Sequence, residues 1–279
     1  MIAEGRRMPA MGKESPLNVR ADWYCSGKRL LDLIVSGILL VPALPLMVIA
    51  VIMVKLTSRG PVIYTQTRVG RSGREFVIFK IRTMRHDCEK LTGPRWADRG
   101  RDPRVTRVGN FLRKTHLDEL PQLYNVFRGD MTLVGPRPER PEFVAQLEQA
   151  IPCYRARLDI RPGVTGLAQL LLPPDVDLHS VRVKLMYDLF YLQKPGFLID
   201  LKLIACTALK VISVPPHVSR RLLSVPHEQV IVAAYEARIR DESDVISRSV
   251  SEEVRGSGLS MAMERSEIER AEMGVQPAY

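Results

Sequence analysis

The chain has 279 residues, with 41 Lys and Arg against 31 Asp and Glu, a formal net charge of +10. That length suits one large domain or two small ones and excludes a chain too short to bury a core. Residues 215–279 carry 8 basic and 11 acidic residues, a net −3, so residues 1–214 carry 33 basic and 20 acidic residues, a net +13. A body this basic indicates an anionic partner: nucleic acid, anionic lipid or a phosphorylated substrate.

The cysteines are scattered along the chain without a C-x-x-C spacing. We therefore expect free thiols in a reducing compartment and no zinc site. No short apolar segment with a small-residue cleavage site follows the N-terminus, which disfavours a cleaved signal peptide. Residues 1–23 are expected to be disordered.

Residues 33–54, LIVSGILLVPALPLMVIAVIMV, contain no charge. At about 1.5 Å per residue, a helix of this length spans roughly 30 Å of hydrocarbon. Pro42 and Pro45 lie in its middle, where each removes a backbone hydrogen bond and favours a kink. Both flanks are basic, whereas a spanning helix should show a charge asymmetry. A helix broken at the prolines, which enters and leaves on the cytoplasmic side within segment 24–57, agrees with both features; a bitopic span stays the alternative.

Residues 58–214 are expected to form one cytosolic domain, and they begin with a change of pattern to period two. β-branched and aromatic runs on either side of a Gly/Ser/Arg turn predict a β-hairpin over 61–82. In its second strand Lys80 and Arg82 share one face, which is either a solvated basic strand end or a substrate contact. Residues 86–104 are polar and turn-rich, which predicts a loop.

Helical patterns follow at 106–115, 119–128, 139–150 and 178–193. Asp118 precedes the second of these helices and is expected to cap it. The helix dipole is expected to keep the Asp118 carboxylate ionised. Taken alone, the Asp118–Glu119 pair therefore indicates a helix cap.

Three segments near the end of the body leave two interpretations open. Arg161 stands beside glycines whose backbone freedom suits a phosphate site, but a plain turn is an equal alternative. The apolar pattern at 197–212 predicts a helix that lies in the membrane interface or packs into the core. Helix 178–193 has a polar stripe that, taken alone, indicates an amphipathic surface. The members of this stripe are Lys184, Tyr187, Asp188 and Tyr191.

Residues 215–279 form a C-terminal extension. VPPHVSRR at 214–221 is expected to break the preceding helix, and 228–241 is predicted to be helical. The remainder is rich in Ser, Glu and Arg and is expected to be disordered or conditionally helical.

Several motifs, in this order, resemble those of one family. They are KRLLDL at 28–33, SRGPVIYTQTRVG at 58–70, FKIRTM at 79–84, RVGNFLRKTHLDELPQLYNVFRGDMTLVGPRPE at 107–139 and RPGVTG at 161–166. The chain resembles the bacterial sugar transferases, the small monotopic phosphoglycosyl transferases, over about residues 24–214. LDELPQL with GDMTLVGPRP is long enough to make chance a negligible explanation.

The resemblance implies transfer of a sugar-1-phosphate from a nucleoside diphosphate sugar, expected to be a UDP-sugar, to polyprenyl phosphate, with release of UMP. This is the first membrane step of exopolysaccharide or related glycan assembly. It implies a mainly helical α+β fold, monotopic, with a re-entrant N-terminal helix, a small β-hairpin and interfacial amphipathic helices on the cytoplasmic face of the bacterial inner membrane. Membrane lipid and later glycan-assembly enzymes are the implied partners, nucleic acid is not, and a homodimer is left open.

The resemblance also implies residue roles. Asp118 matches the nucleophile that attacks the β-phosphorus and forms a phosphosugar–aspartyl intermediate, and Glu119 completes a dyad expected to hold Mg²⁺. The positions that match substrate- or phosphate-binding residues are Arg113, Arg137, Lys80, Arg82, Arg161, Tyr187 and Asp188. The family's helix-breaking Ser-Pro matches Leu44–Pro45, so the Ser is absent here and Pro42 adds a second break.

Two other classes of function compete with this interpretation. Asp175 and Asp177 form a D-x-D, which holds a metal in nucleotide-sugar glycosyltransferases that transfer the sugar without phosphate, but no nucleotide-binding α/β pattern precedes it. A non-catalytic, membrane-anchored interaction protein would use the basic body only to dock on anionic lipid. The presence of both carboxylates together with Arg113 and Arg137 argues against it.

Overall fold

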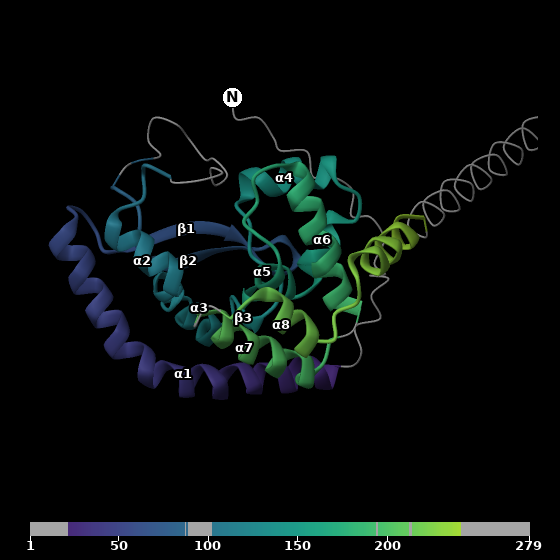
Figure 1. Ribbon diagram of the computed structural model, residues 1–279, viewed down its shortest axis with the longest axis horizontal. Helices are drawn as coiled ribbons and strands as arrows, with labels where there is room; N and C mark the ends of the chain where they lie inside the picture. Colours follow the sequence, from purple (N-terminus) through teal and green to yellow (C-terminus); the bar gives the residue numbers. More distant parts are fainter. Residues whose placement is uncertain (1–21, 87, 89–101, 194, 212–213, 241–279) are drawn as a thin grey trace, which may run out of the picture. The chain divides into compact units, whose positions relative to one another are not determined.

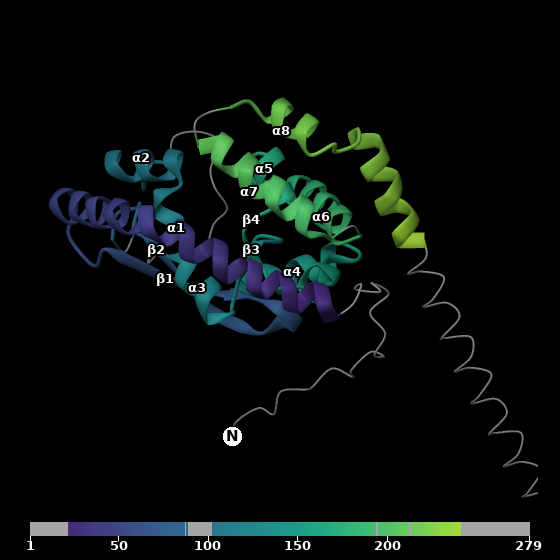
Figure 2. The ribbon, with the colours of Figure 1, turned by 90° about the horizontal axis from the view of Figure 1, so that it is seen from below.

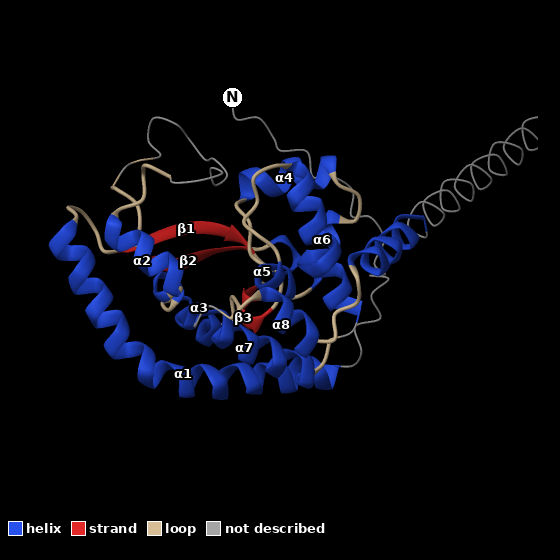
Figure 3. Cartoon of the chain, viewed as in Figure 1, coloured by secondary structure: helices blue, strands red, loops and turns tan. Residues whose placement is uncertain are grey.

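The computed structural model describes residues 22–86, 88, 102–193, 195–211 and 214–240. The predictions for the N-terminal segment up to residue 21, for most of the 86–104 loop and for the tail beyond 240 lie outside these residues. The chain divides into two compact units, Met1–Ile231 and Val232–Tyr279, and the described part of the second unit is helical. The first unit, described below, consists mainly of helices with two small sheets (Figure 3), which confirms the predicted mainly helical α+β fold.

One helix, α1 (Asp22–Thr57), contains the apolar run. Among the described residues it alone is long and apolar enough to cross a membrane. It stays helical through Pro42 and Pro45, and Figure 1 shows that it bends near its middle. Prolines inside a helix remove hydrogen bonds and bend it. The two prolines are therefore accommodated within a single bent helix.

Both halves of α1 bind the rest of the first unit. At its start, Lys28 pairs with Asp200 at 2.6 Å, and Asp32 accepts a hydrogen bond from the Thr132 hydroxyl at 2.5 Å. Its second half contributes to a small buried cluster. The fully buried members of that cluster are Ala50, Val54, Ile81 and Leu112.

The predicted hairpin is confirmed. Strand β1 (Ile63–Val69) pairs antiparallel with β2 (Glu75–Ile81), and Tyr64 lies opposite Lys80. The short 3₁₀ turn η1 (Arg71–Gly73) joins them. Because β2 ends at Ile81, Lys80 lies inside the strand and Arg82 lies just outside it.

The segment around the two carboxylates is not one helix. Helix α2 (Arg107–Thr115) ends at His116, which adopts a left-handed φ of 55°. A 3₁₀ turn, η2 (Leu117–Glu119), follows, and α3 (Gln122–Arg128) begins only three residues later. A positive φ is uncommon for a residue other than glycine, and here it reverses the chain between α2 and η2. The prediction that Asp118 caps a helix is wrong, because no side-chain cap is made at the start of α3.

A second, parallel sheet was not predicted. It pairs β3 (Thr132–Val134) with β4 (Gly163–Thr165). Gly163, the first residue of β4, lies very close to Gly135, which follows β3. A Cβ on Gly163 would lie 2.1 Å from the backbone nitrogen of Gly135. The RPGVTG segment is therefore a strand packed against the GPRP loop, where a turn or phosphate loop was expected.

The remaining elements are α4 (Pro141–Ala150), η3 (Tyr154–Asp159), α5 (Leu167–Leu171), α6 (Leu178–Gln193), α7 (Phe197–Val211) and α8 (Pro216–Leu222). In Figure 2, α5 lies between α8 and α7, and it contacts both of them as well as α6. The prediction that VPPHVSRR breaks the preceding helix is confirmed, because α7 ends at Val211. The segment also contains α8, which was not predicted and whose Pro216 occupies the first helical position that proline favours. The prediction of a surface stripe on α6 is wrong, because Tyr187, Asp188 and Tyr191 are all buried.

Candidate active site

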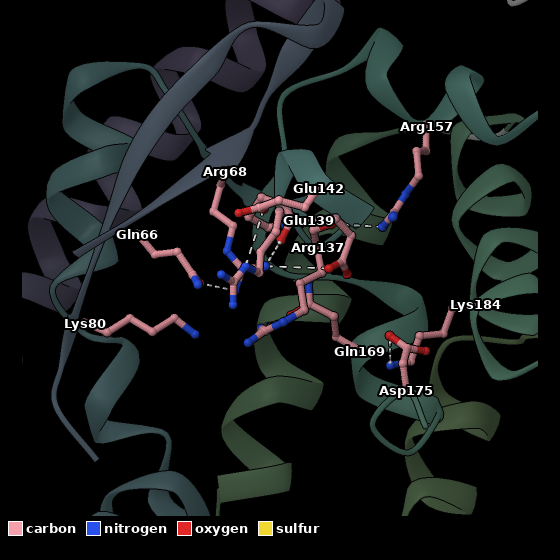
Figure 4. Close-up of polar contacts among 12 residues, drawn as sticks. Gln66, Arg68, Lys80, Arg137, Glu139, Glu142, Arg157, Gln169, Asp175 and Lys184 are labelled. Atoms are coloured by element: carbon pink, nitrogen blue, oxygen red, sulfur yellow. Dashed lines mark hydrogen bonds and ion pairs between the residues drawn. The ribbon is translucent and has the colours of Figure 1, made fainter. Parts of the chain in front are cut away.

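Two cations meet one carboxylate oxygen at the centre of the site. Lys80 on β2 and Arg137 in the GPRP loop both donate to Oε1 of Glu119, at 2.7 and 2.8 Å. Figure 4 shows Lys80 and Arg137 reaching toward one another. The Glu119 side chain is 14% exposed, so these charge-assisted hydrogen bonds are largely shielded from water. The fold thus joins three residues that the resemblance selected.

The charges around Glu119 hold it ionised. Burial alone would raise its pKa, but Arg137 and Lys80 bring that pKa well below its usual value. Glu119 in turn raises the pKa of Arg137, while burial lowers the pKa of Lys80 against the opposing effect of Glu119. At neutral pH Glu119 is therefore an anionic anchor for two cations.

Asp118 is also buried, but its pKa is shifted in the opposite direction. It is 7% exposed, and its carboxylate makes no hydrogen bond within the described part of the chain. Burial first, and then the charge of Glu119, raise the pKa of Asp118 to about 6. The expected dipole stabilisation is wrong in direction, because η2 supplies no cap and desolvation dominates. Asp118 is still mostly ionised above pH 7, with both carboxylate oxygens uncommitted.

Two other arginines that the resemblance selected, Arg113 and Arg82, have different contacts. Arg113 donates from Nε to the Thr83 hydroxyl at 2.8 Å, and its charge is close enough to lower the pKa of Asp118. Arg82 instead donates from Nη2 to the carbonyl and hydroxyl of Ser58, at 3.0 and 2.8 Å. The structure therefore brings Arg113 to the carboxylate pair, whereas Arg82 binds the residue that follows α1.

Two further residues selected by the resemblance have other contacts. Tyr187 on α6 is fully buried, and its hydroxyl accepts a hydrogen bond from Arg220 of α8 at 2.8 Å. Arg161 precedes β4, and its carbonyl oxygen would lie 2.6 Å from a Cβ on Gly135. Both residues help to pack the elements behind the GPRP loop.

The loop that presents Arg137 is fixed along its whole length. Each residue from 135 to 139 has a backbone atom in a hydrogen bond of 2.8 or 2.9 Å. The bonds are Gly135 N to Thr165 O, Gly163 N to Pro136 O, Arg157 Nη2 to Arg137 O, Arg68 Nη1 to Pro138 O, and Val69 N to Glu139 O. With two prolines also present, the arginine is held in place before any ligand binds, which lowers the entropy cost of binding.

Asp188 acts on this loop through Arg157. Arg157 is buried and donates to the Asp188 carboxylate at 2.9 Å and to the Tyr154 hydroxyl at 2.8 Å. It also donates to the Arg137 carbonyl at 2.9 Å, and Figure 4 shows Arg157 beside this loop. Burial raises the pKa of Asp188 to about 6, and Arg157 opposes this effect. Asp188 is therefore a positioning residue in this geometry.

Sequence reasoning missed Arg157, Gln169 and Lys210. Gln169 on α5 accepts from Arg137 Nη1 at 3.3 Å, and Lys210 in the last turn of α7 donates to the Gln169 carbonyl at 2.7 Å. Arg157 is one of several arginines in YRARLDIR and carries no motif. Lys210 had a signal, since it is the single charged residue between 203 and 211.

The carboxylate pair is compatible with magnesium. No group of three or more His, Cys, Asp or Glu residues gathers within the described ranges, which excludes an all-protein metal cage there. Magnesium commonly uses one or two carboxylates together with substrate phosphates. Asp118 and the Oε2 atom of Glu119 provide this donor set, because both lack hydrogen bonds to described residues.

The D-x-D has local structural roles. Asp177 Oδ1 accepts from the Ser180 amide at 2.8 Å and so caps the start of α6. Asp175 pairs with Lys184 at 2.9 Å. These contacts give both aspartates local structural roles, although Oδ1 of Asp175 is buried without a hydrogen-bond partner among the described residues.

The site combines a carboxylate pair with several cationic side chains, and it is built on a domain that carries one helix long and apolar enough to cross a membrane among the described residues. The sequence profile of the family described as "Bacterial sugar transferase" matches residues 23–214. The chain belongs to the bacterial sugar transferase family.

Curated relatives agree with this assignment. A UDP-N-acetylgalactosamine-undecaprenyl-phosphate N-acetylgalactosaminephosphotransferase of Aeromonas hydrophila is 40% identical over 181 residues, 65% of this chain and 42% of the relative. A putative undecaprenyl-phosphate N-acetylgalactosaminyl 1-phosphate transferase of Bacillus subtilis (strain 168) is 47% identical over 135 residues, 48% of this chain and 74% of the relative. A UDP-glucose:undecaprenyl-phosphate glucose-1-phosphate transferase of Xanthomonas campestris pv. campestris is 37% identical, covering 69% of this chain and 40% of the relative. The chain thus spans less than half of the Aeromonas and Xanthomonas proteins.

Proposed function

We propose that this chain transfers a sugar-1-phosphate from a UDP-sugar to a polyprenyl phosphate, giving a polyprenyl-diphosphate-sugar and UMP. One observation carries the proposal: Asp118 is buried, ionisable near neutral pH and without a hydrogen bond to the described residues, beside a glutamate held by two cations. The relatives' names support the substrate class. They differ in the sugar, so N-acetylgalactosamine and glucose are both candidates.

In the first step, Asp118 attacks the β-phosphorus of the UDP-sugar. A bond forms between an Asp118 oxygen and phosphorus, and the bond from that phosphorus to the bridging oxygen breaks, so UMP leaves. Arg137, Lys80 and Arg113 stabilise the charge on the phosphoryl oxygens, as cationic clamps do in phosphoryl transfer. The product of this step is a phosphosugar–aspartyl intermediate.

In the second step, an oxygen of the lipid phosphate attacks the same phosphorus. The new phosphorus–oxygen bond forms as the bond to Asp118 breaks, which returns the carboxylate. Two displacements allow the two anionic substrates to react one at a time, and the fixed Arg137 loop serves both steps.

Asp118 and Glu119 would hold Mg²⁺ together with the substrate phosphates. The ion, when bound, supplies neutralisation of the phosphate charge that would otherwise repel the carboxylate nucleophile. Glu119 would contribute Oε2, since its other oxygen is engaged by Lys80 and Arg137.

For the membrane segment, we propose that α1 is re-entrant and that the domain lies on the cytoplasmic face of the bacterial inner membrane. Lys28 near its start and Val54 near its end both contact the same folded unit. A spanning helix would carry these residues to opposite sides of about 30 Å of hydrocarbon. Apolar residues of α1 near the two prolines, such as Ile38 and Val41, are exposed, which suits burial in one leaflet.

Topology can be tested in inverted membrane vesicles. In a background with Cys25→Ser and Cys88→Ser, the variants Ser26→Cys and Arg59→Cys are treated with a membrane-impermeant maleimide; the remaining cysteines are buried. Re-entry predicts that both new cysteines react without detergent. Reaction of only one of them would establish a bitopic span.

The transfer itself is tested with the full chain in nanodiscs containing polyprenyl phosphate and Mg²⁺. A panel of UDP-sugars is screened for UMP release. Wild type is expected to release UMP from at least one of them, and Asp118→Asn is expected to lose that activity while still inserting and folding. Release of UDP in place of UMP would contradict the proposal, because it would indicate transfer of the sugar without its phosphate.

A further inference from the structure

Helix α7 has two faces with different surroundings. Asp200, Leu203 and Cys206 are buried in the domain, and the Thr207 hydroxyl lies 2.7 Å from that of Thr165 on β4. Along the outer face runs a stripe of exposed apolar residues at helical spacing. The stripe consists of Leu198, Leu201, Ala205, Ala208 and Val211. Of the two roles predicted for this helix, core packing is confirmed for its inner face, and the outer stripe has the composition of a membrane-facing surface.

Lys210 lies on α7 between the exposed stripe and the candidate site. It lies in the last turn of α7, directly before the exposed Val211. Its ammonium group donates to the Gln169 carbonyl at 2.7 Å, and the Gln169 side chain accepts from Arg137. The charges of Arg137 and Glu119 both reach Lys210 strongly enough to act on its pKa, which burial lowers. Lys210 thus lies close to the Lys80, Arg137 and Glu119 cluster, but it comes from a different element, α7.

The acceptor places a geometric demand on the site. Its hydrocarbon chain stays in the bilayer while its phosphate reaches the carboxylate pair. The element that guides it should therefore present apolar residues to the membrane and a cation to the site, as α7 does with its exposed stripe and Lys210. Lys80 and Arg137 are both paired with the carboxylate of Glu119. Lys210 instead donates one hydrogen bond to a neutral group, the Gln169 carbonyl. Its charge is therefore not paired with a carboxylate among the described residues, and two of its three N–H groups remain for a phosphate.

We propose that Lys210 binds the phosphate of the lipid acceptor, at the membrane side of the Asp118–Glu119 pair. The inference rests on the proposed function and deepens it by assigning the acceptor side of the site. Lys80, Arg113 and Arg137 then serve the nucleotide-sugar side, and Lys210 holds the incoming phosphate of the second displacement.

Measuring the two half-reactions separately distinguishes a role of Lys210 in acceptor binding from a general effect on the active site. Release of UMP in a single turnover without lipid reports the donor step alone. Steady-state turnover at increasing polyprenyl phosphate, in nanodiscs, reports acceptor binding. The test compares Lys210→Ala with the charge-conserving Lys210→Arg, and with Lys202→Ala as a matched control on the same helix that makes no hydrogen bond to the site.

Lys210→Ala is expected to raise the KM for polyprenyl phosphate about tenfold or more, the effect of losing a charge-assisted hydrogen bond. Its lipid-free UMP release is expected to stay within about twofold of wild type. Lys210→Arg is expected to restore most of the acceptor affinity, and Lys202→Ala to behave as wild type. An equal loss in both half-reactions, or an unchanged KM for the lipid, would overturn the inference. Absence of UMP release from wild type would instead overturn the proposed function.

Discussion

The raised pKa of Asp118 predicts a specific pH dependence for the first chemical step. The carboxylate has to be ionised to attack phosphorus, and its pKa is about 6, above the usual 3.8. The rate of UMP release should therefore be constant above about pH 7, fall to about half at pH 6 and to about a tenth at pH 5. Glu119 does not contribute to this loss of rate at low pH (the acid limb of the profile), because its pKa lies well below its usual value.

The assay should isolate that step. Single-turnover UMP release without lipid avoids the second ionisation of a phosphate monoester, which also lies near pH 6. Lys80 lowers the pKa of Asp118, so Lys80→Met should shift the midpoint upward as well as slow the reaction. Asp188 also has a pKa of about 6, and an Asp188→Asn variant that keeps the acid limb would assign the limb to Asp118.

A flat profile between pH 5 and pH 8, or a midpoint near 4, would refute this reasoning. Either result would mean that Asp118 is well solvated or hydrogen-bonded in the working enzyme, or that another group performs the attack. A midpoint that moves downward in Lys80→Met would contradict the electrostatic cause.

Two further predictions concern the Arg137 loop. Asp188→Asn removes the carboxylate that pairs with buried Arg157, which should cost about 3 kcal/mol or more of stability and raise the KM for the UDP-sugar. Thermal unfolding should show the loss of stability. The control Arg155→Ala, at an exposed ion pair, should change neither quantity. Gly163→Ala would bring a Cβ to 2.1 Å from a backbone nitrogen of the facing loop and should abolish activity or folding, whereas Gly196→Ala, with no atom within 4 Å, should be tolerated. Full activity of Gly163→Ala would contradict the packing of β4 on the loop.

The parts of the fold with long periodic patterns were predictable from sequence. The hairpin at 61–82 and the helix at 178–193 each offer several repeats of their period, and the structure contains both. Strands β3 and β4 have three residues each, too few to show a period. Their pairing depends on close backbone approach, which a single sequence does not display.

Of the residues selected from the sequence, the structure brings Asp118, Glu119, Lys80, Arg113 and Arg137 together, but their environment could not be predicted. Strand parity placed Lys80 and Arg82 on one face, yet β2 ends between them and Arg82 turns to Ser58. Local sequence predicted that Asp118 caps a helix and is kept ionised by its dipole, whereas burial in the folded domain raises its pKa. Both differences arise from contacts between distant segments, which local patterns do not contain.

Covalent attachment of the phosphosugar to Asp118 can be measured by intact-mass analysis of the full chain after incubation with Mg²⁺ and its UDP-sugar but no lipid. We expect a mass increase equal to one sugar phosphate, mapped to Asp118. This adduct should be absent in Asp118→Asn and removed by added polyprenyl phosphate. UMP release with wild-type rate in Asp118→Asn, or an adduct on another residue, would contradict attachment to Asp118.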